Sequence, residues 1–267
     1  MGFNIFKRKT EEEPIYLDCY TASHYAYNHA KIEQARKYLP EWFKTTPAFA
    51  SDGEDDQITT IKRCPAFRDY YATGIVIPLW GEVEITVHPL GDERGFTWRS
   101  SNPDFDMSCA NHSRYQWEKF SRKNLQNIKF TSPWLFKTVE PVNFTWTQPT
   151  WSQPETFNGL TGLPAVMQFK SQLSTEINYV VELKEEEQAF NLPPLTPLAI
   201  LHPMTERKII IRTHYVARDT LNRLKERAGG MLLDAEEPHI YDTPSRTRAK
   251  KLAFWKKADE LNKCPFK

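Results

Sequence analysis

Histidine and cysteine side chains are the residues of this sequence that could bind a metal or act as nucleophiles. The seven histidines are His24, His29, His88, His112, His202, His214 and His239. His24 and His29 are five positions apart, so they do not share the helical face that an H-E-x-x-H zinc motif requires. The surroundings of His88, His112 and His239 lack the His-x-Asp/Glu spacing of an iron oxygenase. We therefore predict no metal site at the histidines.

An acidic run within residues 47–57 could bind a hard cation. It contains Asp52, Glu54, Asp55 and Asp56. A calcium loop of the EF-hand type needs carboxylates at alternate positions and a distal glutamate, and this run lacks that spacing. The favoured interpretation is a solvated polar loop.

The four cysteines are widely scattered and form no C-x-x-C pair. They are Cys19, Cys64, Cys109 and Cys264, a pattern that favours reduced thiols in a cytosolic compartment over a disulfide framework. Cys109 lies near His112, but this spacing alone does not define a catalytic pair. The sequence also lacks a G-x-S-x-G elbow and a P-loop. We predict no catalytic residue and no cofactor.

A basic segment near the C-terminus could contact nucleic acid. Basic side chains alternate there with Phe254 and Trp255, and the candidate contacts are Arg246, Arg248, Lys250, Lys251 and Trp255. The alternative is a solvated helix face with Trp255 packed inward. The alternative is favoured because the whole chain is nearly neutral, with 35 basic and 34 acidic residues.

A dense group of aromatic residues begins at the middle of the chain. It includes Trp134, Phe136, Phe144, Trp146 and Trp151. Phe144 and Trp146 are two positions apart, so they share one face of a strand. A stacking platform for a sugar or a base is one interpretation, and an aromatic sheet core is the favoured one. If exposed, Trp134, Phe144, Trp146 and Trp151 would form an interaction surface.

The elements that must position these residues are mostly strands. Residues 143–212 are rich in aromatic and β-branched side chains, and Pro, Asn and Gly interrupt them at intervals typical of an antiparallel sandwich or barrel. Val83, Ile85 and Val87 alternate with polar residues, which predicts a strand with one buried face. Pro78 indicates an edge strand or a bulge, and such an edge could pair with a partner.

Helices are expected at both ends of this β core. The spacing of apolar residues predicts helices over about 28–39, 215–228 and 244–262, with shorter segments at 40–44 and 115–120. Trp42 and Phe43 are expected to pack in the core. We predict a tail over residues 1–14, a mainly β domain over 15–213 and a helical extension over 214–267.

Four short segments carry a resemblance to a known family. They are YLPEWFK (38–44), IKRCP (61–65), GIVIPLW (74–80) and SPWLFKT (132–138). With them, most of residues 15–210 resembles an uncharacterised family of proteins from tailed phages, particularly marine and cyanobacterial ones. The resemblance implies a viral origin and no defined chemistry.

A weaker resemblance links residues 163–201 to the β-clip fold of dUTPase-like proteins. It rests on LPAV (163–166), EINYVVEL (176–183), QAFNL (188–192) and LAIL (198–201). In that family a carboxylate follows the first of these strands, whereas Met167 and Gln168 stand here. Residues 193–195, Pro-Pro-Leu, replace the glycine of the nucleotide-binding turn. These differences argue against pyrophosphatase activity.

These observations together predict a phage-encoded structural or assembly protein that is not an enzyme. It would act through protein–protein contacts with other viral proteins or with copies of itself, in the host cytoplasm or in the virion. No stretch approaches the ~18 apolar residues that span a bilayer, so no membrane partner is expected. The alternatives are an enzyme acting on a nucleotide or small metabolite, and a nucleic-acid-binding protein that uses the basic C-terminal segment.

Overall fold

A computed structural model covers the chain and describes residues 12–51, 57–92, 95–102, 109–112, 124–170 and 175–224. Several expectations fall outside these residues. They concern residues 1–11 of the tail, the acidic run 52–56, the segments 115–120 and 244–262, and the candidate contacts Arg246, Arg248, Lys250, Lys251 and Trp255.

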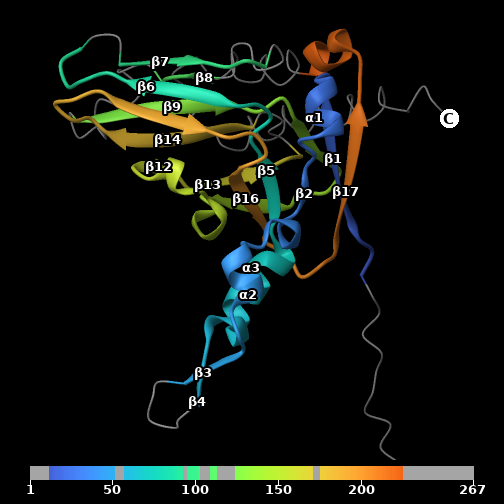
Figure 1. Cartoon of the computed structure of the whole chain (residues 1–267). Helices are drawn as coiled ribbons and strands as arrows, with labels where there is room; N and C mark the ends of the chain where they lie inside the picture. The colour runs from blue at the N-terminus through green and yellow to red at the C-terminus, as the bar shows by residue number, and fades with distance from the viewer. Residues whose placement is uncertain are drawn as a thin grey trace, which may run out of the picture.

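The protein is mainly β, as predicted, with short strands and few helices (Figure 1). The strands are β1 (Ile15–Thr21), β2 (Glu33–Gln34), β3 (Phe49–Ser51), β4 (Gln57–Thr59), β5 (Ile75–Pro78), β6 (Val83–Val87), β7 (Phe96–Arg99), β8 (Cys109–Ala110), β9 (Leu125–Thr131), β10 (Leu135–Thr138), β11 (Asn143–Thr147), β12 (Leu160–Gly162), β13 (Ala165–Gln168), β14 (Glu176–Glu182), β15 (Gln188–Leu192), β16 (Pro197–Pro203) and β17 (Ile209–Tyr215).

The helical elements are short. They are α1 (His24–Asn28), α2 (Glu41–Thr45), α3 (Pro65–Thr73) and the 3-10 turns η1 (Ala35–Tyr38), η2 (Ile61–Arg63), η4 (Thr150–Ser152) and η5 (Glu155–Phe157). Residues 218–224 are also helical, which confirms that part of the helix expected over 215–228. Leu221 of this helix packs against Leu135 of β10.

The strands form a sandwich-like set of sheets whose inner faces share one large core. The sheet orders are β13-β11-β16-β5-β2, β12-β14-β9-β8, β15-β6-β7 and β10-β1-β17, with a separate β3-β4 hairpin. Pairing is antiparallel except between β1 and β17, which run parallel. In β6, Val83, Ile85 and Val87 are buried while the intervening residues are partly exposed, so the predicted one-sided burial is confirmed.

Aromatic side chains fill the middle of this core. Phe136 stacks on Phe169 at a centroid distance of 5.0 Å, and Phe144 packs on the same ring at 5.1 Å. Trp134 and Phe144 are fully buried and Trp146 is 3% exposed. The favoured interpretation of these residues as a sheet core is therefore confirmed. Their alternative use as an interaction surface is wrong for Trp134, Phe144 and Trp146, because no partner could reach them.

The helix expected over residues 28–39 is wrong. Helix α1 ends at Asn28, and the chain then forms β2 and η1. Glu33 and Gln34 pair with Val76 and Ile75 of β5, and the Ala35 amide donates to the Gly74 carbonyl over 2.8 Å. Ile32 and Ala35 are buried as the apolar spacing suggested. The backbone of this segment therefore hydrogen-bonds to strand β5, and these tertiary bonds take the place of the bonds that a local helix would form.

Pro78 marks a register shift and not an edge strand. Strand β5 lies between β16 and β2, so the edge expected here is wrong. The pairing of β5 with β16 shifts between Pro197 and Ala199, at the position where Pro197 faces Pro78. Proline cannot donate to a ladder, and an irregular register tolerates it.

Gly74 joins α3 to β5 at a point with no room for a side chain. A Cβ atom there would lie 2.6 Å from Ile200 Cδ1 and 2.8 Å from the Tyr70 carbonyl oxygen. We expect Gly74→Ala to lower the free energy of unfolding by about 1–3 kcal/mol, the usual cost of overpacking. Urea denaturation followed by circular dichroism would measure this loss.

Ile200→Val is the matched control for this prediction because it removes the Cδ1 atom that meets the new methyl group. The double variant Gly74→Ala/Ile200→Val should lose less stability than the sum of the single variants. If the losses of unfolding free energy in the two single variants simply add in the double variant, the contact with Ile200 is not the cause of the destabilisation by Gly74→Ala.

Candidate interaction surface

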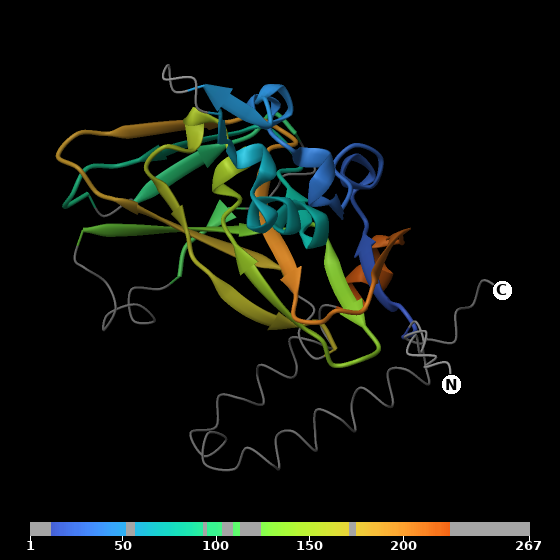
Figure 2. The same cartoon turned by 90° about the horizontal axis from the view of Figure 1, so that it is seen from below.

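A group of small elements projects from the body of the protein. It comprises η1, α2, β3, β4, η2 and α3, and we call it the arm (described residues 35–51 and 57–73). Figure 1 shows it extending below the sheets, with the β3–β4 hairpin furthest away. Figure 2 views the molecule from below, with these helices facing the viewer. The arm therefore presents side chains beyond the compact body.

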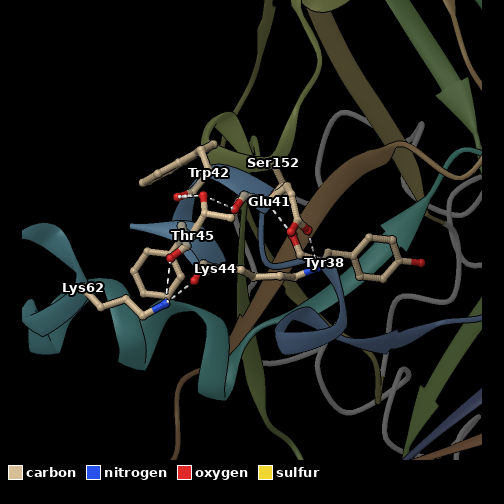
Figure 3. Close-up of polar contacts among 8 residues, drawn as sticks. Tyr38, Glu41, Trp42, Lys44, Thr45, Lys62 and Ser152 are labelled. Carbon is tan, nitrogen blue, oxygen red and sulfur yellow. Dashed lines mark hydrogen bonds and ion pairs between the residues drawn. The ribbon is translucent and has the colours of Figure 1, made fainter. Parts of the chain in front are cut away.

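Helix α2 is held in the arm by hydrogen bonds to its last turn (Figure 3). The Lys62 ammonium donates to the carbonyl oxygens of Phe43 and Lys44 over 2.7 and 3.0 Å, and its Nζ lies 4.7 Å from the centre of the Phe43 ring. Thr45 Oγ1 donates to the carbonyl oxygen of Trp42 over 3.1 Å. Carbonyl groups at a helix C-terminus lack intrahelical partners, so these donors stabilise a helix of five residues.

A stack of aromatic rings joins the arm to the body. Phe67 of α3 stacks on Phe43 with centroids 4.3 Å apart, and it packs against Tyr71 at 5.0 Å. Trp42 and Trp151 each contact the Phe67 ring, at 5.7 and 5.5 Å. Phe43, Phe67 and Tyr71 are buried. Phe67 packs against the inner side of both tryptophans, and Phe43 packs against Trp42.

The outer side of this stack is exposed. Trp42 and Trp151 lie 6.2 Å apart and are 42% and 50% exposed. Phe49 of β3 and Ile58 of β4 are also exposed, but they point to opposite faces of the hairpin, since Phe49 lies opposite Thr59 and Ile58 lies opposite Ala50. We call Trp42 and Trp151 the aromatic patch. Single exposed apolar residues are ordinary, whereas a supported group of large ones is typical of a contact surface.

Trp151 is held from two sides. It belongs to η4, where the neighbouring Ser152 hydroxyl donates to the Tyr38 carbonyl oxygen over 3.0 Å (Figure 3). Ser152 also hydrogen-bonds the Tyr71 hydroxyl. Because η1 and α3 each hold this turn, the Trp151 ring is fixed against the arm.

The aromatic residues that the sequence suggested as an interaction surface differ in their exposure. Trp151 alone among Trp134, Phe144, Trp146 and Trp151 reaches the surface. Trp42, which we expected in the core, is exposed, while Phe43 is buried as predicted. A signal for this difference exists in the sequence. Adjacent residues on a helix point about 100° apart, so when Phe43 faces the centre of the buried side, Trp42 lies at its edge or outside it.

Basic side chains outnumber acidic ones among the described residues of the arm. The described residues of the arm contain six basic residues, Arg36, Lys37, Lys44, Lys62, Arg63 and Arg68, and two acidic ones, Glu41 and Asp69. Arg36, Arg63 and Arg68 are exposed, and the Arg63 guanidinium lies 4.7 Å from the centre of the Phe49 ring. Residues 52–56 add four acidic side chains to the same stretch of sequence and lie outside the described residues.

A second charged group lies on the sheet β10-β1-β17. Asp18 of β1 accepts hydrogen bonds at Oδ1 from Arg212 Nε and His214 Nε2, over 2.7 and 2.8 Å. Its Oδ2 accepts from Arg212 Nη2 over 2.6 Å. These bonds raise the pKa of Arg212 above its ordinary value. Because both oxygens of Asp18 accept strong donors, the carboxylate is suited to structural pairing and poorly suited to act as a general base.

Aromatic rings and a lysine enclose this charged group. Tyr20 stacks on His214 at 4.7 Å, and the Arg212 guanidinium lies 4.3 Å from the centre of the Tyr16 ring. Lys137 of β10 is the strand partner of Asp18 and is also buried. Asp18 therefore accepts hydrogen bonds from Arg212 and His214, and these bonds offset the cost of burying its charge.

Two of the three described cysteines, Cys19 and Cys109, are poor nucleophiles. Cys19 and Cys109 are buried, and burial raises the pKa of each thiol well above its ordinary value. The thiolate is the reactive form, so a raised pKa lowers reactivity at neutral pH. In the described part of the chain, no three His, Cys, Asp or Glu side chains gather as metal ligands.

His202 of β16 packs on Tyr70 at 4.6 Å, and its Nε2 lies 2.9 Å from the Tyr70 carbonyl oxygen. Burial lowers the pKa of His202, while this hydrogen bond partly opposes the shift. Folding therefore favours the neutral ring. The contribution of His202 to stability is full above its ordinary pKa of 6.5 and is lost as the pH falls through the lowered value.

We expect the stability difference between the natural protein and His202→Gln to shrink as the pH falls from 8 to 5. The glutamine amide can donate to the Tyr70 carbonyl but does not titrate, so other pH effects cancel in the comparison. Chemical denaturation of both proteins at several pH values measures the difference. A difference that does not change with pH would contradict the assignment.

The chain matches no protein-family model, no curated protein and no solved structure. Among the described residues, no helix combines the length and the apolar character that crossing a membrane requires. The class that the structure defines is therefore a mainly β protein with a projecting arm and an exposed aromatic patch.

Proposed function

We propose that this protein is a structural or assembly protein that is not an enzyme and acts through protein–protein contacts. The observation that carries the proposal is the aromatic patch, in which Trp42 of the projecting arm and Trp151 of η4 lie together and are both exposed. The resemblance to tailed-phage proteins supports a viral partner, either in the host cytoplasm or in the virion.

The physical properties of the patch suit protein recognition. Tryptophan is enriched among the residues that contribute most to binding energy at interfaces, and two tryptophans lie together here. The buried rings of Phe43 and Phe67 fix the exposed tryptophans before any partner binds. Fixing side chains in advance lowers the conformational entropy lost on binding.

The enzyme alternative has less support. Asp18 and His214 are a carboxylate–imidazole pair, but Arg212 already holds both oxygens of the carboxylate. A shallow hollow over β12, β14 and β15 is lined by Thr161, Val180, Glu182 and Gln188 among others, and contains no residue of this pair. The charged group and the hollow therefore do not form one site.

The test measures how much of the protein enters purified virus particles. We expect Trp42→Ala/Trp151→Ala to reduce incorporation at least tenfold, since interface tryptophans contribute about 2 kcal/mol or more each. Quantitative mass spectrometry of salt-washed particles, normalised to the infected-cell lysate, gives the ratio.

Met204→Ala is the control, because Met204 is an exposed apolar residue outside the arm. It should be incorporated like the natural protein. Equal incorporation of the tryptophan variant, or the absence of the natural protein from particles and from any complex in the lysate, would overturn the proposal.

A further inference from the structure

We infer that strand β13 pairs edge to edge with the same strand of a second copy of this chain. The contact would join the sheet β13-β11-β16-β5-β2 of one molecule to the same sheet of the other, with the two β13 strands antiparallel about a two-fold axis at Val166. This surface is separate from the aromatic patch, so the inference goes beyond the proposed function.

The backbone of β13 has one side that β11 does not use. The Met204 amide donates to the Asn143 carbonyl oxygen over 2.8 Å, so Asn143 of β11 bonds toward β16. Hydrogen-bonded pairs alternate along antiparallel strands, so the next residue, Phe144, bonds to Met167 of β13. The amide and the carbonyl of Val166, which precedes Met167, therefore point away from β11 toward the open edge of the sheet.

This open edge is apolar and uncharged. Val166 is 57% exposed, and the neighbouring Ala165 is also exposed. The strand consists of Ala, Val, Met and Gln, and its register with β11 is regular, without a bulge. Within the described residues, no backbone group bonds to Val166 from the open side. An edge with these properties is a template for a further strand.

Other sheet edges of the protein are protected. At β12, Gln148 Nε2 donates to the Leu160 carbonyl oxygen over 3.2 Å, and Gln148 Oε1 accepts from the Gly162 amide over 2.7 Å. At β17, the charged Arg212 is exposed in the middle of the strand. Side-chain capping and exposed charge are usual means of preventing edge pairing. Strand β13 has neither of them.

A second β13 strand supplies the groups that this edge lacks. In an antiparallel pair centred on Val166, the Val166 amide of each copy donates to the Val166 carbonyl oxygen of the other. The two exposed valine side chains then lie opposite each other on one face of the joined sheet. Cross-strand pairs of β-branched residues stabilise a sheet, so the symmetric arrangement satisfies both the backbone and the side chain.

The sequence on both sides of the axis is compatible with this symmetry. Lys170 is the only charged residue between positions 160 and 170. The two-fold axis places Lys170 of the two copies at opposite ends of the paired strands, so no like charges meet. Pro164 has no amide hydrogen, which ends the new ladder close to the axis. A ladder this short predicts a reversible dimer.

The test introduces opposite charges at position 166 of the full chain. Val166→Lys and Val166→Glu should each self-associate about tenfold more weakly than the natural protein, because like charges would meet across the axis. An equimolar mixture of the two variants should regain association as 1:1 dimers, since the introduced ammonium and carboxylate groups then lie opposite each other. Sedimentation velocity over a range of concentrations measures these equilibria, and thermal melts check that each variant is folded.

Leu90→Lys is the matched control, because it adds the same charge at an exposed apolar residue of the connection after β6. It should associate like the natural protein. A mixture of the two Val166 variants that stays monomeric would overturn the inference. A natural protein that is monomeric at every concentration would overturn it as well.

Two further measurements separate this contact from the aromatic patch. Trp42→Ala/Trp151→Ala keeps β13 intact and should dimerise like the natural protein. If that variant is monomeric while Val166→Lys still dimerises, self-association belongs to the patch and the inference fails. Hydrogen exchange reports on the edge directly, because protection of the Val166 amide should rise with protein concentration. Dimerisation without this protection would also contradict the inference, while the particle measurement decides the proposed function independently.

Discussion

Replacing Trp134 by alanine is expected to lower the free energy of unfolding by about 3–5 kcal/mol, the range for large-to-small changes of buried aromatic residues. Trp134 is fully buried, and its Nε1 donates to the Ala30 carbonyl oxygen over 3.1 Å. The substitution would create a cavity and leave that carbonyl without this donor. Urea denaturation followed by far-ultraviolet circular dichroism measures the loss.

Trp151→Ala is the matched control, because it removes the same side chain from a position that is 50% exposed. It should change stability by less than about 1 kcal/mol, since truncating an exposed residue leaves no cavity. Similar losses in the two variants would contradict the division between core and patch. If Trp134→Ala does not fold, Trp134→Phe keeps most of the volume and still removes the hydrogen bond.

Replacing Asp18 by alanine is expected to cause the second largest loss in the free energy of unfolding, about 2–4 kcal/mol. Removing one partner of a buried ion pair costs about 3–5 kcal/mol, and the partly exposed Arg212 and His214 reduce that cost through hydration. The change leaves Arg212 and His214 without the carboxylate that accepts their hydrogen bonds. Equilibrium unfolding of the variant gives the value.

A double-mutant cycle separates this pairing from loss of packing. Asp18→Ala and Arg212→Ala should be non-additive by about 0.5–3 kcal/mol, because each removes the same contact. Lys37→Ala, which breaks the exposed i,i+4 pair with Glu33, is the control and should change little. Additive losses at Asp18 and Arg212 would show that the pair contributes no net stability.

The fold class could be predicted because its strands have local signatures. The alternation in β6 and the apolar runs of β14 and β16 identify strands without knowledge of their partners. The segment 28–39 could not be predicted in this way. Its apolar spacing fits a helix, but its backbone pairs with β5, which lies about forty residues further along the chain. Helix α3 was missed, although Pro65 at its first turn is a usual start signal.

The candidate site was predicted only in part, for a similar reason. Spacing shows that Phe144 and Trp146 share a face, but it does not show which face is buried. Trp151 was identified, while its neighbour Trp42 comes from an element more than a hundred positions earlier. Asp18 and His214 are 196 positions apart in the chain, and only the parallel pairing of β1 with β17 brings them together.

That parallel pairing also determines how the protein would bear tension. β1 and β17 are the first and last described strands, and they run side by side from Ile15↔Ile209 to Thr21↔Tyr215. A force that pulls the chain apart at its two ends would slide these strands along each other. All the hydrogen bonds between them would then be loaded together, and not broken one after another as in a zipper. The fold is thus arranged to resist stretching through its ends, a useful property for a chain anchored at both ends in an assembly.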